Sequence, residues 1–395
     1  MKVSIIHVWL ALACCTVSSY GQVGVGSVGS QDRATTPSIA PPRAPDIEPT
    51  GSIDINVPTT CNANTLAPWS ATFSADGSGL YVSLFGGFIG SGACEVLRLD
   101  GETGAVTDHI PVDEGPLEIA LRRTPQGGVL QGFVTCSSGS SVAVFDGMNQ
   151  FVTSIPLPPD PSSSFGTAFP FGLVVDEARG VVWVGTNDSS GRVFAIDIPT
   201  LTLDLGRSLQ LGLERSTARM ALFQGELIIP AFRFTPTFTG STAELVFIDP
   251  DNPSAADAVL ITTSDGQAAF PSPQEVGITS DGRALVAGFD LGRRIHVIDI
   301  PTRTLLAPFP TFTSTFLGKY QGLRISPDGL VVVIDFWSNE VARLNSVGGV
   351  FFGVTDPGEL IGNHSGLTAA VFRPDGTELI LVGKGTNSLA RLSVQ

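Results

Sequence analysis

The sequence has little positive charge, little histidine and, beyond its first residues, no long hydrophobic run. Its 22 lysine and arginine residues stand against 37 acidic ones, and the formal net charge is −15. The phosphate backbone of a nucleic acid would be repelled, so no nucleic-acid partner is expected. After residue 22 no apolar stretch reaches the roughly 18 residues that a membrane-spanning helix needs. The hydrophobic fraction of 43% is therefore expected to form an internal core.

The chain also lacks the short motifs of common enzymes. It contains no G-x-S-x-G, no H-E-x-x-H, no P-loop and no cysteine pair at metal-binding spacing. Three histidines follow the N-terminal segment. His109 and His296 are expected to lie in strands as packing residues. His364, in "IGNHSG", is the one candidate general base, although an ordinary loop histidine is the favoured interpretation.

The N-terminal residues predict an exported protein. Lys2 and the apolar stretch in "MKVSIIHVWLALACC", followed by small residues up to Gly21, have the pattern of a signal peptide spanning 1–21. In the alternative, "LALAC" acts as a lipoprotein signal and Cys14 carries the lipid. Residues 22–50 are rich in Gly, Pro and Ser without periodicity and predict a flexible linker. A secreted, periplasmic or cell-surface location is expected, with membrane attachment only through a lipid.

The rest of the chain repeats one unit seven times, at intervals of 45 to 57 residues. Each unit has a short strand, a turn related to "SPDG", a strongly apolar strand and a polar loop. A third strand follows and ends in Asp or a substitute, as in "VFAID" (193–197) and "IHVID" (295–299). A fourth strand often comes next, as in "VTDHIPV" (106–112). The turn glycines that mark the units are Gly77, Gly127, Gly180, Gly225, Gly282, Gly329 and Gly376.

Units of this length with four strands predict an all-β, seven-bladed β-propeller over residues 51–395. The second strand of each unit is apolar almost throughout because neighbouring blades would cover both of its faces. The last unit stops after its third strand, whereas "GSIDINVPT" (51–59) resembles a fourth strand without a partner. We expect it to complete the seventh blade and close the ring, which removes an exposed sheet edge.

On these motifs the chain resembles the YVTN-type or YncE-like seven-bladed propellers, which are related in architecture to lactonase-type propellers. The resemblance rests on the "SPDG"-type turn, on apolar strands such as "LYVSL" and "VVWVGTN", and on V-x-x-I-D endings. The literal YVTN tetrapeptide and the WD dipeptide are absent. The resemblance implies the architecture and leaves the activity open.

The longer loops are expected on one face of the propeller, opposite the Asp-Gly turns, and loops on a rigid scaffold commonly bind ligands. This long-loop face is rich in aromatic residues, which would form a binding surface if exposed. The favoured alternative is that the rings fold inward and fill the space between loops. They are Phe85, Phe88, Phe165, Phe169, Phe232, Phe234, Phe238, Phe309, Phe312, Phe316 and Tyr320.

Polar residues at the blade ends on this face are expected to point at the mouth of the central channel. Those from inner strands are Glu118, Arg219, Glu275 and Gln321, and those from second strands are Asn187, Asp290, Asp335 and Lys384. Converging oxygens would hold a hard cation such as calcium, which would polarise a carbonyl group or activate water. The resemblance to lactonase-type propellers implies such a site, but no family metal motif matches. The favoured alternative is a polar channel in which Arg219 and Lys384 balance the acids.

Together these features predict a monomeric binding scaffold for a protein, glycan or small-molecule ligand on the long-loop face. The expected ligand-binding residues are Glu118, Asn187, Arg219, Glu275, Asp290, Asp335 and His364. A metal-assisted, lactonase-like hydrolase is the first alternative, and a purely structural cell-surface module is the second.

Three cysteines, Cys61, Cys94 and Cys136, remain after signal removal, and an exported chain folds where disulfides persist. We expect a bond between Cys61 and Cys94. A bond between Cys94 and Cys136 is the alternative, and three free thiols are the third option.

Overall fold

The computed structural model describes most of the chain from residue 47 onward. Of residues 234 and 351–355 it describes the backbone alone. The described residues are 47–55, 67–86, 93–159, 167–212, 214–234, 240–253, 256–261, 271–289, 291, 294–309, 320–336, 340–346, 351–355, 366–384 and 388–395.

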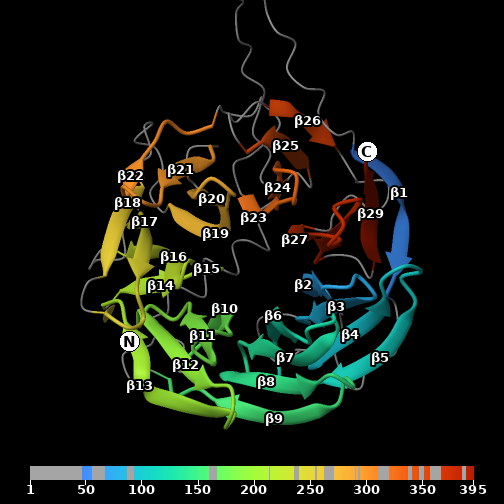
Figure 1. Ribbon diagram of the computed structural model, residues 1–395, viewed down its shortest axis with the longest axis horizontal. Coiled ribbons are helices and arrows are strands. Elements are labelled where there is room, and N and C mark those ends of the chain that lie inside the picture. The colour runs from blue at the N-terminus through green and yellow to red at the C-terminus, as the bar shows by residue number, and fades with distance from the viewer. Residues whose placement is uncertain are drawn as a thin grey trace, which may run out of the picture. The chain divides into compact units, whose positions relative to one another are not determined.

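These residues form seven small antiparallel sheets arranged around a central axis, with no helix among them, which confirms the predicted seven-bladed propeller (Figure 1). No described helix is therefore long and apolar enough to span a membrane. The first three blades, from the axis outward, consist of β2 Pro68–Phe73, β3 Gly79–Leu84, β4 Glu95–Asp100 and β5 Val106–Pro111; of β6 Pro116–Arg123, β7 Val129–Cys136, β8 Ser141–Asp146 and β9 Phe151–Pro156; and of β10 Pro170–Asp176, β11 Val181–Thr186, β12 Arg192–Asp197 and β13 Thr202–Gln210.

The fourth blade has an inner strand in two pieces, and the fifth to seventh are regular. Their strands are β14 Arg215–Thr217, β15 Ala221–Phe223, β16 Glu226–Phe234, β17 Ser241–Ile248 and β18 Asp257–Ile261; β19 Ser272–Ile278, β20 Arg283–Phe289, β21 His296–Asp299 and β22 Thr304–Leu305; β23 Tyr320–Ile325, β24 Leu330–Asp335, β25 Val341–Asn345 and β26 Phe351–Thr355; and β27 Leu367–Phe372, β28 Glu378–Gly383, β29 Ser388–Val394 and β1 Ile47–Asp54.

The hydrophobic core lies between adjacent blades, as the apolar second strands predicted. Every residue of β3, β11 and β24 is buried. In the cluster between the second and third blades, for example, Phe133 and Val144 pack with Val182 and Phe194. Each second strand is thus covered on both faces, and this explains why its sequence does not alternate between apolar and polar residues.

The repeated turns share one backbone conformation at their marker glycines. All seven marker glycines have positive φ, from 64° at Gly180 to 89° at Gly127. This left-handed region is open to glycine at little cost. In the first blade the Ser74 hydroxyl donates to Asp76 Oδ1 at 2.6 Å, and Oδ1 also accepts the Ser78 backbone N–H at 3.0 Å. A local hydrogen-bond pattern therefore explains why the motif recurs.

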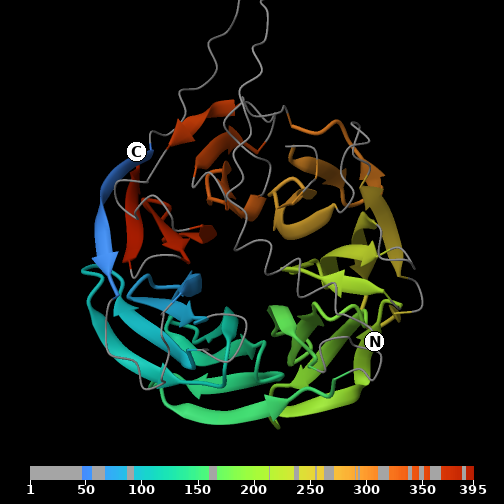
Figure 2. The same cartoon turned by 180° about the vertical axis from the view of Figure 1, so that it is seen from behind.

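The ring is closed by β1, as predicted, because this strand pairs antiparallel with β29 from Ile47 opposite Val394 to Asp54 opposite Ser388. In both views the blue strand lies beside the red one near the C-terminus (Figures 1 and 2). The strand begins at Ile47, inside the segment expected to be linker, because the Ile47 side chain is buried in the cluster shared by the sixth and seventh blades. Residues 56–59 of the predicted strand lie outside the described residues.

The described aromatic residues of the long-loop face fold inward, so they do not form an exposed binding surface. Phe85, Phe232, Phe309 and Tyr320 are all buried, and Phe169 is half-buried. The other loop phenylalanine side chains lie outside the described residues. The two strand histidines are where they were expected, His109 in β5 and His296 in β21, with His296 buried.

Cys94 is disulfide-bonded, whereas Cys136 is a buried free thiol. The alternative bond between Cys94 and Cys136 is therefore wrong. Burial raises the pKa of the Cys136 thiol to about 12, so it is not a reactive thiolate at neutral pH. Cys61 lies outside the described residues, so its bond to Cys94 stays a prediction.

Peptide mapping of the native protein without reduction is expected to yield a linked pair of peptides that contain Cys61 and Cys94. Cys136 is expected to react with an alkylating reagent only after unfolding, because its side chain is fully buried. Three thiols alkylated in the unfolded, unreduced protein would contradict this pairing.

Candidate functional site

The inner strands share an irregularity near their first residues, on the long-loop side of the channel. In six blades the register between the inner and second strands shifts there. The shifts lie at Pro68/Ser70, Pro116/Ile119, Pro170/Leu173, Pro273/Glu275, Tyr320/Gly322 and Leu367/Ala369. In the fourth blade the inner strand is interrupted between β14 and β15. Bulges of this kind change the direction of side chains and often occur beside functional sites.

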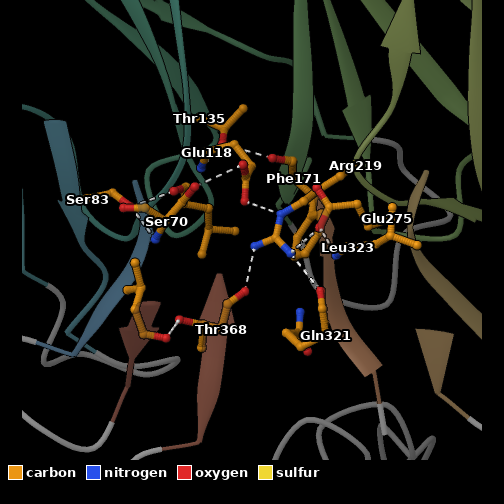
Figure 3. A network of polar contacts seen from close by, with 12 residues as sticks. Ser70, Ser83, Glu118, Thr135, Phe171, Arg219, Glu275, Gln321, Leu323 and Thr368 are labelled. Carbon is orange, nitrogen blue, oxygen red and sulfur yellow. Dashed lines mark hydrogen bonds and ion pairs between the residues drawn. The ribbon is translucent and has the colours of Figure 1, made fainter. Parts of the chain in front are cut away.

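Arg219 lies in the interruption of the fourth blade, and its guanidinium contacts blades across the axis (Figure 3). Its Nε donates to Glu118 Oε1 of the second blade at 2.5 Å. Its Nη1 donates to the Gln321 carbonyl of the sixth blade at 2.8 Å, and its Nη2 to the Thr368 carbonyl of the seventh at 3.2 Å. The side chain is only 5% exposed, so these bonds are largely protected from water.

Further contacts extend this arrangement to every blade. The Arg219 backbone N–H donates to the Gln274 carbonyl of the fifth blade at 3.2 Å, and its guanidinium lies 5.8 Å from the Phe171 ring of the third. Glu118 also accepts a hydrogen bond from the Ser70 hydroxyl of the first blade, at 3.1 Å. Two charged neighbours, Glu275 and Arg324, belong to the same set. We call the whole set the axial network: Ser70, Glu118, Phe171, Arg219, Glu275, Gln321, Arg324 and Thr368.

The charges of the axial network balance. Glu275 forms an ion pair with Arg324 and accepts the Leu323 backbone N–H at 2.8 Å, and its Oε2 lies 3.8 Å from Arg219 Nη1. Desolvation, with repulsion from Arg219, lowers the pKa of Arg324 to about 10, so the guanidinium stays charged at neutral pH. Two carboxylates therefore face two guanidiniums. Glu118, Arg219 and Glu275 are buried, and buried charges persist only when they are paired and hydrogen-bonded.

Two glycines make room for the axial network. A Cβ at Gly172 would lie 2.4 Å from the Ala218 carbonyl oxygen and 3.0 Å from Arg219 Cα. A Cβ at Gly322 would lie 3.3 Å from Glu275 Oε2. The fourth and fifth blades thus approach their neighbours closely at this level because these residues have no side chain.

Hydroxyl groups connect neighbouring blades beside the axial network. The Ser83 hydroxyl, on the second strand of the first blade, donates to the Leu117 carbonyl at 2.6 Å. Thr135, at the same place in the second blade, donates to the Phe171 carbonyl at 3.0 Å. Sequence reasoning missed both, although a single polar residue near the end of an apolar strand was a usable signal.

The four residues predicted from inner strands, Glu118, Arg219, Glu275 and Gln321, come together, although Gln321 contributes its backbone carbonyl to Arg219. Asn187 Nδ2 donates to the Thr217 carbonyl at 3.1 Å and so links the third and fourth blades.

Of the other second-strand residues, Asp335 is fully buried at the end of β24, and the Lys384 ammonium lies 5.9 Å from the Trp69 ring. Asp290 and His364 lie outside the described residues. Sequence reasoning did not predict Ser70, Arg324 or Thr368 as partners in the axial network.

The described residues contain no group of three or more His, Cys, Asp or Glu side chains arranged to hold a metal ion. Within the axial network, Glu118 and Glu275 each face a guanidinium. A hard divalent cation is bound by carboxylates whose charge it neutralises, and here arginine already provides that charge. These two carboxylates are therefore better suited to holding blades together than to binding calcium.

The chain is thus a seven-bladed β-propeller with a charged, self-neutralised network across its axis. No protein-family model and no curated protein sequence matches it.

Solved structures share the fold. Hydrazine synthase of Kuenenia stuttgartiensis has a TM-score of 0.63 at 17% identity, over 85% of this chain and 98% of that one. Virginiamycin B lyase from Staphylococcus aureus has a TM-score of 0.62 at 12% identity, over 89% and 100%. The WD40 repeats of RRP9 have a TM-score of 0.63 at 12% identity, also over 89% and 100%. At these identities the likeness shows the fold alone.

Proposed function

We propose that this protein is an exported, monomeric binding scaffold that engages a protein, glycan or small-molecule ligand on its long-loop face. The observation that carries the proposal is the axial network, which joins blades at the level where the long connections begin. A frame held together in this way keeps the ends of the loops at constant positions, which favours selective binding. Export is inferred from residues 1–21, and membership of the YncE-like propellers from the repeat motifs.

The binding proposal is tested with two exposed arginines at opposite faces. Arg233 is near the end of β16 on the long-loop face, and Arg123 is the last residue of β6 on the turn face. A library of oligosaccharides, peptides and metabolite-sized compounds is screened by the shift in melting temperature of the purified protein. Each stabilising compound is then mapped by hydrogen exchange.

At least one binder is expected to protect the long connections, and Arg233→Ala is expected to weaken more of the compounds that do so than Arg123→Ala does. If no binder protected the long connections, or if the two substitutions affected such binders equally, the proposal would be overturned.

A metal-assisted, lactonase-like hydrolase is the alternative, because the solved structures of this fold include proteins named as a lyase and a synthase. Under the binding proposal, adding calcium, magnesium, manganese or zinc leaves the melting temperature unchanged, since arginine already neutralises Glu118 and Glu275. Model lactones are expected to remain intact. A metal-dependent rise in melting temperature that Asp290→Ala with Asp335→Ala abolishes would favour the hydrolase, because a ligand that binds the folded state stabilises it by mass action.

A further inference from the structure

A pocket of about 340 Å³ opens where the turns of the third, fourth and fifth blades meet. It lies on the turn face, opposite the long-loop face. Arg179 comes from the turn between β10 and β11, and Phe223 to Glu226 form the turn between β15 and β16. Asp249 follows β17, and residues 300–303 connect β21 to β22. The volume falls at the lower end of small-molecule sites, which span about 300–1,000 Å³.

The charged side chains that line the pocket form ion pairs, and Arg179 also contacts two carboxylates beyond the lining. Arg303 Nη2 lies 2.6 and 2.7 Å from the two carboxylate oxygens of Glu226. Arg179 Nη2 lies 3.4 Å from Asp249 Oδ1 and 2.7 Å from Asp251 Oδ2, and its Nη1 lies 2.9 Å from Asp176 Oδ2. An anion would meet the carboxylates that surround Arg179, so the pocket disfavours an anionic ligand. The two lining carboxylates are already paired with arginine, so a neutral ligand can enter without displacing a charged partner.

The pocket is also held in a defined shape. The Arg303 guanidinium carbon lies 4.1 Å from the centre of the Phe247 ring, and its Nη1 donates to the Ile300 carbonyl at 2.6 Å. Arg179 Nη1 donates to the Gly225 carbonyl at 2.9 Å, which joins the third blade to the fourth. Polar groups that are already oriented lose little entropy when a ligand binds.

Polar groups remain available to a ligand beside an apolar wall. The Asp249 side chain is 54% exposed, and an ionised carboxylate offers about four acceptor sites. The Gln224 side chain is exposed, with a donor and an acceptor in its amide group. Phe223, Ile300 and Pro301 provide apolar surface next to them. Adjacent donors and acceptors next to an apolar wall match a sugar ring, which has hydroxyl groups at its edge and C–H bonds on its faces.

We propose that this turn-face pocket binds one neutral pyranose ring, such as the terminal residue of a glycan. The site is separate from the long-loop face, so this proposal does not depend on the binding function proposed there.

The test uses saturation-transfer NMR with the purified protein and six sugars. Glucose, galactose, mannose and N-acetylglucosamine are neutral, whereas glucosamine and glucuronate carry a positive and a negative charge. The test variant combines Gln224→Gly with Asp249→Ala. Gln224 has a φ of +52°, which glycine adopts readily, so this change removes a side chain without straining the turn. The matched control is Gln126→Gly, which precedes the marker glycine of the second blade as Gln224 precedes that of the fourth.

At least one neutral sugar is expected to bind with a dissociation constant of about 1 mM. The double variant is expected to weaken it at least about fivefold, as the loss of one or two hydrogen bonds implies. Gln126→Gly and Arg233→Ala are expected to leave it unchanged, and the melting temperatures confirm that each variant is folded. Absence of binding by all four neutral sugars, tighter binding of a charged sugar, or equal binding by the folded double variant would overturn the proposal.

Discussion

Arg219→Ala is expected to lower the free energy of unfolding by about 3–5 kcal/mol, the range observed when one partner of a buried ion pair is removed. The substitution leaves Glu118 beside Ser70 without a guanidinium, in a position where its side chain is 10% exposed. It also removes the donors to the Gln321 and Thr368 carbonyls, and with them the contact of the fourth blade with the sixth and seventh. Urea denaturation followed by tryptophan fluorescence measures the change.

Two further substitutions make this result specific to the axial network. Arg233→Ala removes an exposed arginine of the same blade and is expected to change stability by no more than about 0.5 kcal/mol. Arg219→Lys keeps the charge but loses the planar group that reaches three partners, so it is expected to fall between the wild type and Arg219→Ala. If Arg219→Ala were no more destabilising than Arg233→Ala, the axial network would not hold the ring together.

Removal of residues 1–55 is expected to lower the free energy of unfolding by roughly 5 kcal/mol. The deletion removes three buried isoleucine side chains, and burial of one such side chain contributes about 1.5–3 kcal/mol. Ile47, Ile53 and Ile55 are 5%, 6% and 0% exposed. The deletion also leaves β29 as an unpaired edge, which promotes aggregation. Thermal and urea unfolding measure the loss.

Removal of residues 1–46 alone is the matched control and is expected to leave stability unchanged, since β1 begins at Ile47. A synthetic peptide of residues 47–55, added to the shorter protein, is expected to raise its melting temperature as its concentration increases. Equal melting temperatures for the two truncations would show that β1 does not close the ring.

The sequence by itself determined the number of blades and the way the ring closes. These features follow from local requirements that recur in every unit, so the same residue types repeat along the sequence. Gly77 and Gly329 must adopt positive φ, and β11 and β24 must be apolar because blades cover both of their faces. The beginning of β1 was placed too late because Pro49 and its neighbours have the composition of a linker. Only the burial of Ile47 between two blades shows that the strand starts there.

The polar sites depended on contacts that have no periodicity. The sequence did predict that Glu118, Arg219 and Glu275 come from inner strands and face the axis, since a strand's place in the repeat determines its direction. It could not show that Arg219 contacts the carbonyl of Thr368, 149 residues away, because any residue has a carbonyl group. Likewise Asn187 donates to a backbone oxygen, and the turn-face pocket combines turns of three blades. Local geometry is encoded in each repeat, whereas the partners of buried charges are decided only when the ring brings distant blades together.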